Sequence, residues 1–408
     1  MESVTGPPGA AVSTAAPGSR VRAAAISAEW RRAIVAGLSC FLVYKVASEV
    51  VALIAAYGAA FPRVLAHDPG ALAKVWDHWD VGWYTSIARD GYLAYSHVLI
   101  PPGHFQNGAA FPPALPVLTR LVMIVGHRHA LISGLFVTAV ALAVGLVGLY
   151  RLAALDFGDR VAATTLVLLL VFPASFFFNS VYSEALVLAG CVWAVLLTRM
   201  KLWPLAGLFA ALAVMAKIAA VLVVVLMLIE YNPFARRSWT RRLWEMAWIG
   251  GPTVLALAGL TYYFWTREHD ALVYVTANKD WSRSFQPMWQ MAAGAVGDVL
   301  SLKTFDQVHG LVTFLDVVSL FLLIGMTVYT WFRVRRSYAV FMALVTLSVG
   351  SAGYIESTTR HVLLAFPFFI AAAFLVNARP WLDRAVMAIS APMWAYILSR
   401  FATGGWAG

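Results

Sequence analysis

The chain has 408 residues, of which 61% are hydrophobic and only 12% are charged. Soluble globular proteins carry about 25% charged residues, so this composition excludes an ordinary water-soluble domain and indicates a helical protein of the membrane. The net charge of +10 does not indicate binding to nucleic acid, because the basic residues are spread over short loops between apolar runs, as in cytoplasmic loops of membrane proteins.

The N-terminal residues 1–32 are rich in Gly, Pro, Ala and Ser and are predicted to form a disordered cytoplasmic tail. The apolar run Ala33–Phe61 follows Arg31 and Arg32 and is too long for the core of a cleavable signal peptide. We therefore expect it to stay as the first spanning helix. Lys45 and Glu49 lie four residues apart in this run, and we expect them to neutralise each other against the bundle.

Residues 62–110 are too polar to span and are predicted to form a first external loop lying on the membrane surface. Pro112, Pro113 and Pro116 then begin a short apolar stretch that ends near Gly126. We expect this stretch to dip into the membrane without crossing it. Irregular backbone at that depth is tolerated only against protein or a water-filled space, so we expect a cleft there.

The remaining apolar runs predict further spanning helices in a single domain covering residues 33–400. They lie at Leu131–Tyr150, Val161–Ser180, Glu184–Thr198, Ala247–Trp265, Leu311–Phe332, Tyr338–Tyr354, Val362–Val376 and Leu382–Leu398. Leu205–Glu230 carries Lys217 in its middle, and a lysine at mid-bilayer is costly, so this run predicts a short helical hairpin with Lys217 at its outer tip. The expected fold is all-α, with about 11 transmembrane helices, a second external loop at 266–310 and a short tail at 401–408.

The most distinctive stretch is the acidic and aromatic segment Trp76–Tyr84 of the first external loop. Asp77 and Asp80 are three residues apart, so a helical turn would place both carboxylates on one face, where one could act as a general base. A solvated turn in which the aspartates cap a helix is the alternative. The surrounding Trp and Tyr rings are typical of sugar-binding surfaces, although they also anchor proteins at membrane interfaces.

Three further charged residues lie at predicted outer ends of helices. Glu184 either caps a helix or faces an external cavity, and Lys217 either binds a phosphate or extends to the interface. Arg360 either contacts a lipid phosphate together with His361 or pairs with Glu356 one helical turn away. A carboxylate base and cations around one outward-facing cavity predict a sugar donor whose leaving group is a lipid phosphate.

Cysteine and histidine give no indication of a metal site. Cys40 and Cys191 fall in separate apolar runs, and the histidines show no metal-ligand spacing. We therefore assign no metal ligand and expect no cofactor, with a divalent cation held by Asp77 and Asp80 as the alternative.

Several motifs resemble those of the PIG-V-type mannosyltransferases, membrane glycosyltransferases of the GT-C fold. The similar segments are His78-Trp79-Asp80 with Trp83-Tyr84 and Asp90-Gly91-Tyr92, Phe111–Pro116, Phe172–Glu184, Leu205–Lys217 and Arg360–Pro367. The chain departs from the family pattern at Lys217, where an Arg-Pro-Thr element is usual, and at His361, which stands in place of a tyrosine.

This resemblance implies that mannose is transferred with inversion from a polyprenyl-phosphate-mannose donor to a glycolipid or lipoglycan acceptor. It assigns Asp80 as the general base, Lys217 and Arg360 to the donor phosphate, and Glu184 to orienting the acceptor or a loop. The other residues expected to bind donor or acceptor are Asp77, His78, Trp79, Trp83, Tyr84, Tyr182 and His361.

The expected location is the cell membrane, with many spans, contacts with membrane lipids and an active site on the extracytoplasmic face. Two alternatives stay open at this point. The first is a GT-C transferase that moves another sugar or glycosylates protein. The second is a transporter of lipid-linked sugars, which would favour binding sites at mid-membrane between symmetric repeats.

Overall fold

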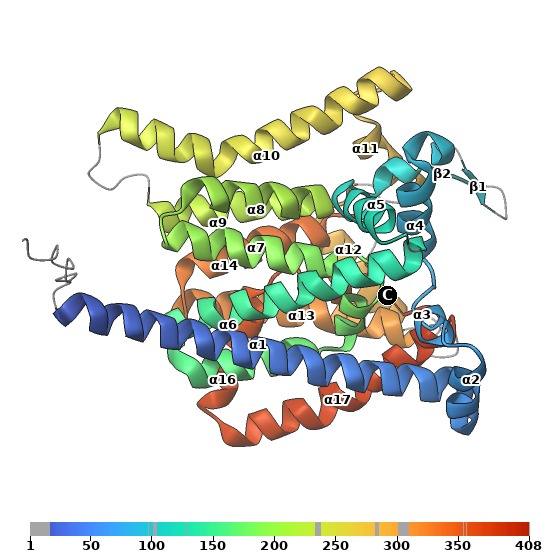
Figure 1. Ribbon diagram of the computed structural model, residues 1–408, viewed down its shortest axis with the longest axis horizontal. Coiled ribbons are helices and arrows are strands. Elements are labelled where there is room, and N and C mark those ends of the chain that lie inside the picture. The colour runs from blue at the N-terminus through green and yellow to red at the C-terminus, as the bar shows by residue number, and fades with distance from the viewer. Residues whose placement is uncertain are drawn as a thin grey trace, which may run out of the picture.

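The computed structural model describes residues 17–96, 98–100, 104–127, 129–232, 238–281, 285–300, 310–353, 355 and 357–407. It is a bundle of helices (Figure 1). Within the described residues the only strands are β1 (Val98–Ile100) and β2 (His104–Gln106), a small antiparallel hairpin in which Leu99 faces Phe105. The helical fold class expected from the sequence is confirmed.

The α-helices are α1 (Pro17–Tyr57), α2 (Phe61–His67), α3 (Ala71–Lys74), α4 (Val81–Asp90), α5 (Ala114–Gly126), α6 (Ala130–Leu170), α7 (Glu184–Arg199), α8 (Trp203–Ala216), α9 (Leu222–Tyr231), α10 (Trp239–Glu268), α11 (Val273–Thr276), α12 (Met288–Leu300), α13 (Gly310–Arg333), α14 (Arg336–Gly350), α15 (Thr358–Val362), α16 (Pro367–Asn377) and α17 (Pro380–Ala402). Short 3₁₀ helices join them: η1 (Gly58–Ala60), η2 (Tyr92–Tyr95), η3 (Gly108–Ala110), η4 (Pro173–Asn179), η5 (Ile218–Val221) and η6 (Ala277–Trp281).

The chain is a membrane protein by the length and hydropathy of its helices. Among the described residues, five helical segments are long and apolar enough to cross a bilayer, namely Ile26–His67, Ala130–Leu170, Trp239–Glu268, Gly310–Arg333 and Pro380–Ala402. The segments η4 and α7, bent by 95° at their junction, make a sixth if they count as one span. The other apolar helices are shorter, so the figure of about 11 spans stays a prediction.

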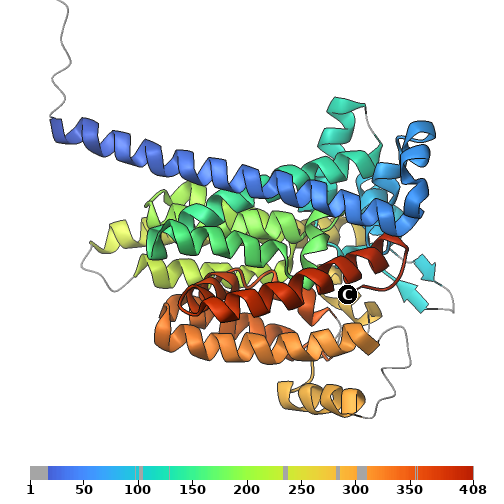
Figure 2. The same cartoon turned by 90° about the horizontal axis from the view of Figure 1, so that it is seen from below.

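Two predicted boundaries were wrong. The N-terminal tail was expected to reach residue 32, but α1 already begins at Pro17, and Figure 2 shows its first turns extending past the bundle; residues 1–16 lie outside the described part. The C-terminal tail was expected from residue 401, but α17 continues to Ala402 and the following residues pack on the first external loop.

Two predicted spans correspond to two helices that share the label α6 and are joined at Gly158. Helix α6 covers both Leu131–Tyr150 and the first half of Val161–Ser180, and it is interrupted at Gly158, whose φ of 80° only glycine adopts readily. The helix ends at Leu170, and the chain continues into η4. The helix predicted at Val161–Ser180 is therefore shorter than expected.

The predicted hairpin around Lys217 is confirmed. Helix α8 ends at Ala216, Lys217 has an extended backbone, and the chain returns through η5 and α9. At the far end of the hairpin, Arg199 before α8 binds Glu230 in α9 at 3.0 Å. Close packing of α8 against α10 depends on Gly207, because a Cβ there would lie 2.0 Å from the carbonyl oxygen of Trp248.

The bundle has two chemically different ends. At the left of Figure 1 lie the ends of α7, α9 and α13 and the starts of α8, α10, α14 and α17. Arg335 binds Asp156 at this end. Basic residues such as Arg241 and Arg336 belong to the helix starts. Helices α2 to α5 and the β-hairpin cover the right end (Figure 1). The basic residues at these helix ends therefore gather at one end of the described part of the bundle.

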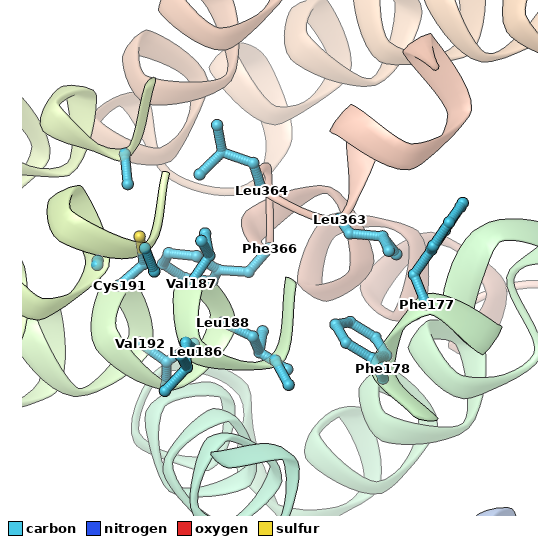
Figure 3. Packing of buried hydrophobic residues seen from close by; sticks show 14 of the residues in the cluster. Phe177, Phe178, Leu186, Val187, Leu188, Cys191, Val192, Leu363, Leu364 and Phe366 are labelled. Atoms are coloured by element: carbon cyan, nitrogen blue, oxygen red, sulfur yellow. The ribbon is translucent and has the colours of Figure 1, made fainter. Parts of the chain in front are cut away.

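The core beneath the right end is apolar and tightly packed. Phe177 and Phe178 of η4 meet Leu363 and side chains of α7 (Figure 3), and both phenylalanines are at most 2% exposed. The chain segments that carry charged residues toward this end are therefore held on a rigid apolar base.

Candidate functional site

A cavity of about 230 Å³ lies at the right end of the bundle. Its walls come from the first external loop, the α7 start, the hairpin tip, α10, the second external loop and α15. The lining residues are Asp80, Tyr84, Ala109, Ala110, Phe111, Pro112, Ser183, Ala216, Lys217, Ile218, Ala219, Leu260, Phe264, Tyr274, Asn278, Arg360 and His361. The cleft predicted beside the short apolar stretch after Pro112 is therefore present.

Four charged side chains, far apart in the sequence, form a linked chain at this cavity. Arg360 Nη1 donates to Asp80 Oδ2 at 3.0 Å, and Arg360 Nε donates to Glu184 Oε1 at 2.6 Å. Lys217 Nζ binds the same Glu184 oxygen at 3.1 Å. The order is thus Asp80, Arg360, Glu184, Lys217, and we name these four residues the cavity cluster.

The members of this cluster differ in exposure. The Glu184 side chain is 3% exposed and Arg360 11%, whereas Lys217 is 18% and Asp80 25% exposed. Glu184 is therefore the buried centre, bound by two cations, and Asp80 is the member most open to a ligand. A buried carboxylate of this kind is stable only with such partners.

Arg360 contacts aromatic rings as well as carboxylates. Its guanidinium carbon lies 4.5 Å from the ring centre of Tyr182 and 4.8 Å from that of Phe177. Burial alone lowers the pKa of Arg360, but the carboxylates of Glu184 and Asp80 outweigh it, and the pKa stands above its ordinary value. The cation is permanent, and its position is fixed.

The first external loop separates the two aspartates that were expected to act together. Trp79 has a positive φ of 58°, so residues 77–80 do not form a helical turn. Asp80 enters the cavity just before α4, and its backbone N–H donates to the Tyr182 hydroxyl at 3.2 Å. Asp77 is exposed and does not line the cavity. The prediction of two carboxylates on one face was wrong.

The capping alternative does not hold for Asp80 either, because its side chain makes no capping hydrogen bond to α4. Asp80 is the residue that begins that helix, but its carboxylate turns to Arg360 instead. The solvated alternative fits Asp77 alone.

Three aromatic residues of the motif do not line the cavity but support its walls. His78 Nε2 lies 3.3 Å from the Ala402 carbonyl oxygen, and the Trp79 indole N–H donates to the Gly405 carbonyl oxygen at 3.2 Å. Trp83 stacks on Phe111, whose ring does line the cavity, at 5.6 Å. His78 and Trp79 therefore fasten the loop to the C-terminal end of the chain.

Other predicted residues do reach the cavity or its immediate support. Tyr84 and His361 line it, and Tyr182 lies under Arg360. Burial raises the pKa of Tyr84 well above its ordinary value, so its phenol keeps a proton to donate. His361 Nδ1 lies 2.7 Å from the Ser357 carbonyl oxygen.

The predicted Lys45–Glu49 pair is confirmed at 3.1 Å and has a further role in the fold. The indole N–H of Trp76 donates to Glu49 at 3.0 Å, and Lys45 lies over the Trp76 ring. The intramembrane pair thus ties α1 to the loop that carries Asp80. The alternative pairing of Arg360 with Glu356 falls on a residue outside the described part of the chain.

Sequence reasoning missed the second external loop and α10 as walls of the cavity. Tyr274, Asn278, Leu260 and Phe264 line it, and the Asn278 amide donates to the Tyr274 carbonyl oxygen at 2.9 Å. These residues have no motif spacing, and only the packing of α11 and η6 against η3 brings them near Asp80. Phe177 lies in Phe172–Glu184, one of the segments that resemble the PIG-V-type family. Its position there gave no indication that its ring packs against Arg360.

Within the part of the chain that the structure describes, no group of three or more His, Cys, Asp or Glu residues could hold a metal ion. The cavity cluster alternates acids and bases, an arrangement that suits an anionic ligand better than a cation.

No protein-family model and no curated protein matches the chain. Solved structures with some similarity include the oligosaccharyltransferase of Archaeoglobus fulgidus in its apo form, with 13% identity, a TM-score of 0.43 and coverage of 91% of this chain and 56% of that one. ArnT from Cupriavidus metallidurans, bound to undecaprenyl phosphate, has 14% identity, a TM-score of 0.48 and coverage of 85% and 77%.

The archaeal enzyme AglB, in complex with an inhibitory peptide and a dolichol-phosphate, covers 90% of this chain at 13% identity and a TM-score of 0.41. The chain spans just over half the length of these archaeal oligosaccharyltransferases. These similarities are weak, with every TM-score below 0.5, and the residues of the cavity themselves carry the functional argument.

Proposed function

We propose that the protein is a membrane glycosyltransferase that transfers mannose, with inversion, from a polyprenyl-phosphate-mannose donor to a glycolipid or lipoglycan acceptor outside the cytoplasm. The observation that carries this proposal is the cavity cluster, in which a partly exposed carboxylate and two cations meet at one cavity. The motifs that resemble the PIG-V-type mannosyltransferases supply the choice of sugar.

In the proposed reaction Asp80 accepts the proton of the acceptor hydroxyl as that oxygen attacks the anomeric carbon of mannose. The bond between the anomeric carbon and the phosphate oxygen breaks, and its electron pair stays on the leaving polyprenyl phosphate. Arg360 and Lys217 stabilise the charge that develops on this phosphate. Attack from the face opposite the leaving group inverts the anomeric centre.

The ion pair between Asp80 and Arg360 gives the donor a second role. In the structure one oxygen of the Asp80 carboxylate accepts a hydrogen bond from the Arg360 guanidinium. A donor phosphate that takes the Arg360 Nη1 donor, now 3.0 Å from Asp80, releases the carboxylate for proton transfer. Glu184 keeps Arg360 in place during this exchange through its own two hydrogen bonds.

The size and position of the cavity support a sugar phosphate as the part that enters. Its volume of about 230 Å³ is below the roughly 300–1,000 Å³ of pockets for drug-sized ligands, so it suits a sugar with its phosphate while the lipid stays in the membrane. The cavity lies at the end of the bundle formed by α4, the start of α7 and the tip of the hairpin. Arg199, at the end of α7, and Arg335, just before α14, lie at the opposite end, which the positive-inside rule places in the cytoplasm.

A transfer assay with defined donors tests the proposal. The purified protein in proteoliposomes is given radiolabelled polyprenyl-phosphate mannose, or the glucose or arabinofuranose equivalents, with an extracted glycolipid fraction as acceptor. We expect label in a new glycosidic product from the mannose donor alone, and none with the D80N variant. If another donor gives the labelled product, its sugar replaces mannose in the proposal. If the donor crosses the bilayer and no product forms, the protein is a transporter.

A further inference from the structure

We propose that Asp316 of α13 is a positioning residue that holds Arg360 at the cavity. The inference rests on the proposed function in one respect, since it takes Arg360 to bind the donor phosphate. Asp316 lies in an apolar helix that can span the membrane, and it is 0% exposed. It is an acidic residue inside an apolar run, a position where burial is costly and function is common, and it lies outside the segments that resemble a known family.

The carboxylate of Asp316 is occupied by the segment that leads to Arg360. It accepts hydrogen bonds from the backbone N–H of Ser357 at 3.1 Å, the backbone N–H of Thr359 at 2.7 Å and the Thr359 hydroxyl at 2.7 Å. Hydrogen bonds to an ionised acceptor are strong, and a buried carboxylate is costly without them. The carboxyl group buried in α13 therefore fixes the backbone next to Arg360.

The backbone of this segment needs such fixing. Ser357 has a φ of 65°, in the left-handed region that is unfavourable for a residue with a side chain. This strained turn begins α15. The carbonyl oxygen of Ser357 accepts a hydrogen bond from the His361 backbone N–H at 2.9 Å. Ser319, one turn beyond Asp316 on α13, adds a hydrogen bond to the Thr359 hydroxyl at 3.1 Å.

Arg360 follows Thr359 directly, and its side chain makes contacts of its own. Its guanidinium lies over the rings of Tyr182 and Phe177 and binds Asp80 and Glu184. The turn is thus clamped by α13 on one side while its arginine reaches the cavity on the other. A shift of the turn moves the cation away from the phosphate that it is proposed to bind.

The variant D316N tests this arrangement, because it keeps the shape of the side chain but replaces one acceptor oxygen by a donor that faces backbone N–H groups. We expect faster amide hydrogen exchange across residues 357–363, about 100-fold weaker binding of polyprenyl phosphate in detergent micelles, and a similar loss of transfer. The milder variant T359V removes the two hydrogen bonds of the hydroxyl, to Asp316 and from Ser319, but keeps the backbone bond to Asp316. It is expected to change both readouts in the same direction by less.

The matched control is E245Q, which alters another buried carboxylate, 4% exposed, in α10. Its partners include Tyr231 and Arg241, neither of which lines the cavity. We expect E245Q to leave exchange at 357–363 and phosphate binding unchanged.

A double variant separates positioning from general destabilisation. If Asp316 acts through Arg360, adding D316N to R360A causes no further loss of polyprenyl-phosphate binding, because the group that it positions is already gone. Additive losses, or unchanged exchange at residues 357–363 in D316N, overturn the inference. If the wild type binds polyprenyl phosphate through Arg360 but transfers no sugar, the proposed function fails, and exchange and binding still decide the role of Asp316.

Discussion

Two clusters of four charges lie at opposite ends of the bundle, and each contains two carboxylates and two cations. The cavity cluster is Asp80, Glu184, Lys217 and Arg360. The second, which we name the opposite cluster, is Asp156, Glu230, Arg199 and Arg335. By charge alone the two are equivalent, and sequence reasoning identified only the first.

The opposite cluster is a closed network. Each arginine binds both carboxylates at 2.7–3.1 Å. Tyr338 donates to Asp156 at 2.8 Å and accepts from Arg199, and Ser337 donates to Glu230. It joins α6, α7, α9 and α14, and its charges are satisfied internally.

The cavity cluster is an open chain instead. Among the described residues the Asp80 carboxylate contacts a single cation, Arg360, and it stays 25% exposed beside the cavity. The comparison teaches that a balanced group of charges is not in itself a site. A site needs a member whose partner can be exchanged for a ligand.

The largest expected effect is that of D80N, which removes the open end of the chain. Loss of a general base typically costs 10²–10⁴-fold, and we expect kcat to fall by about 10³-fold. KM for the donor is not expected to rise, because the donor phosphate no longer competes with the Asp80 carboxylate for Arg360. The measurement is initial transfer rate against donor concentration, with thermal unfolding as the check of folding. Activity within tenfold of the wild type removes Asp80 as the base.

A smaller effect is expected for R360K. Lysine keeps the charge but cannot bind Asp80 and Glu184 together through a planar group. We expect about 10²-fold weaker binding of polyprenyl phosphate, seen as a raised KM along with a lower kcat. K217A, which leaves Arg360 on Glu184, serves as the comparison and is expected to lose less. An equal loss in both variants would mean that the phosphate is held by charge alone.

These expectations show which parts of the site the sequence could reveal. Glu184, Lys217 and Arg360 were singled out because each is a charge next to an apolar run, where burial is costly and function is common. Asp80 was singled out by the acidic and aromatic segment around it. The helical hairpin around Lys217 followed from the same reasoning. Charge placement in a membrane protein is thus informative even without helical periodicity.

The rest of the site depends on tertiary packing and backbone conformation. Because Trp79 has a positive φ, Asp77 and Asp80 do not share one face of a helical turn. No residue pattern in the sequence predicts that a tryptophan adopts the left-handed backbone conformation. Tyr274 and Asn278 reach the cavity only because the second external loop folds over it. Asp156 and Glu230 were missed because, in the sequence, acidic residues near basic loops look like ordinary charges on the solvent-exposed surface.

The opposite cluster should respond to E230Q in stability and not in catalysis. Glu230 is 2% exposed and binds both arginines, and breaking a buried pair costs about 3 kcal/mol because uncompensated charge remains. We expect a lower unfolding midpoint in denaturant and transfer per folded molecule within twofold of the wild type. A large loss of kcat at unchanged stability would show that the two ends are coupled.

The smallest effect is expected for D77N, which tests whether the cavity, and not the acidic motif, defines the site. Asp77 is exposed and outside the cavity, so its charge is screened by solvent and its loss should alter transfer by less than twofold. D80N is the matched comparison, since both substitutions are isosteric and lie three residues apart in one loop. If D77N instead lowers kcat tenfold or more, Asp77 must turn inward when the donor binds, and the difference between an open and a closed cluster no longer explains which acid is used. Donor-dependent protection of Asp77 from carbodiimide labelling would then distinguish such a movement from a change in the fold of the loop.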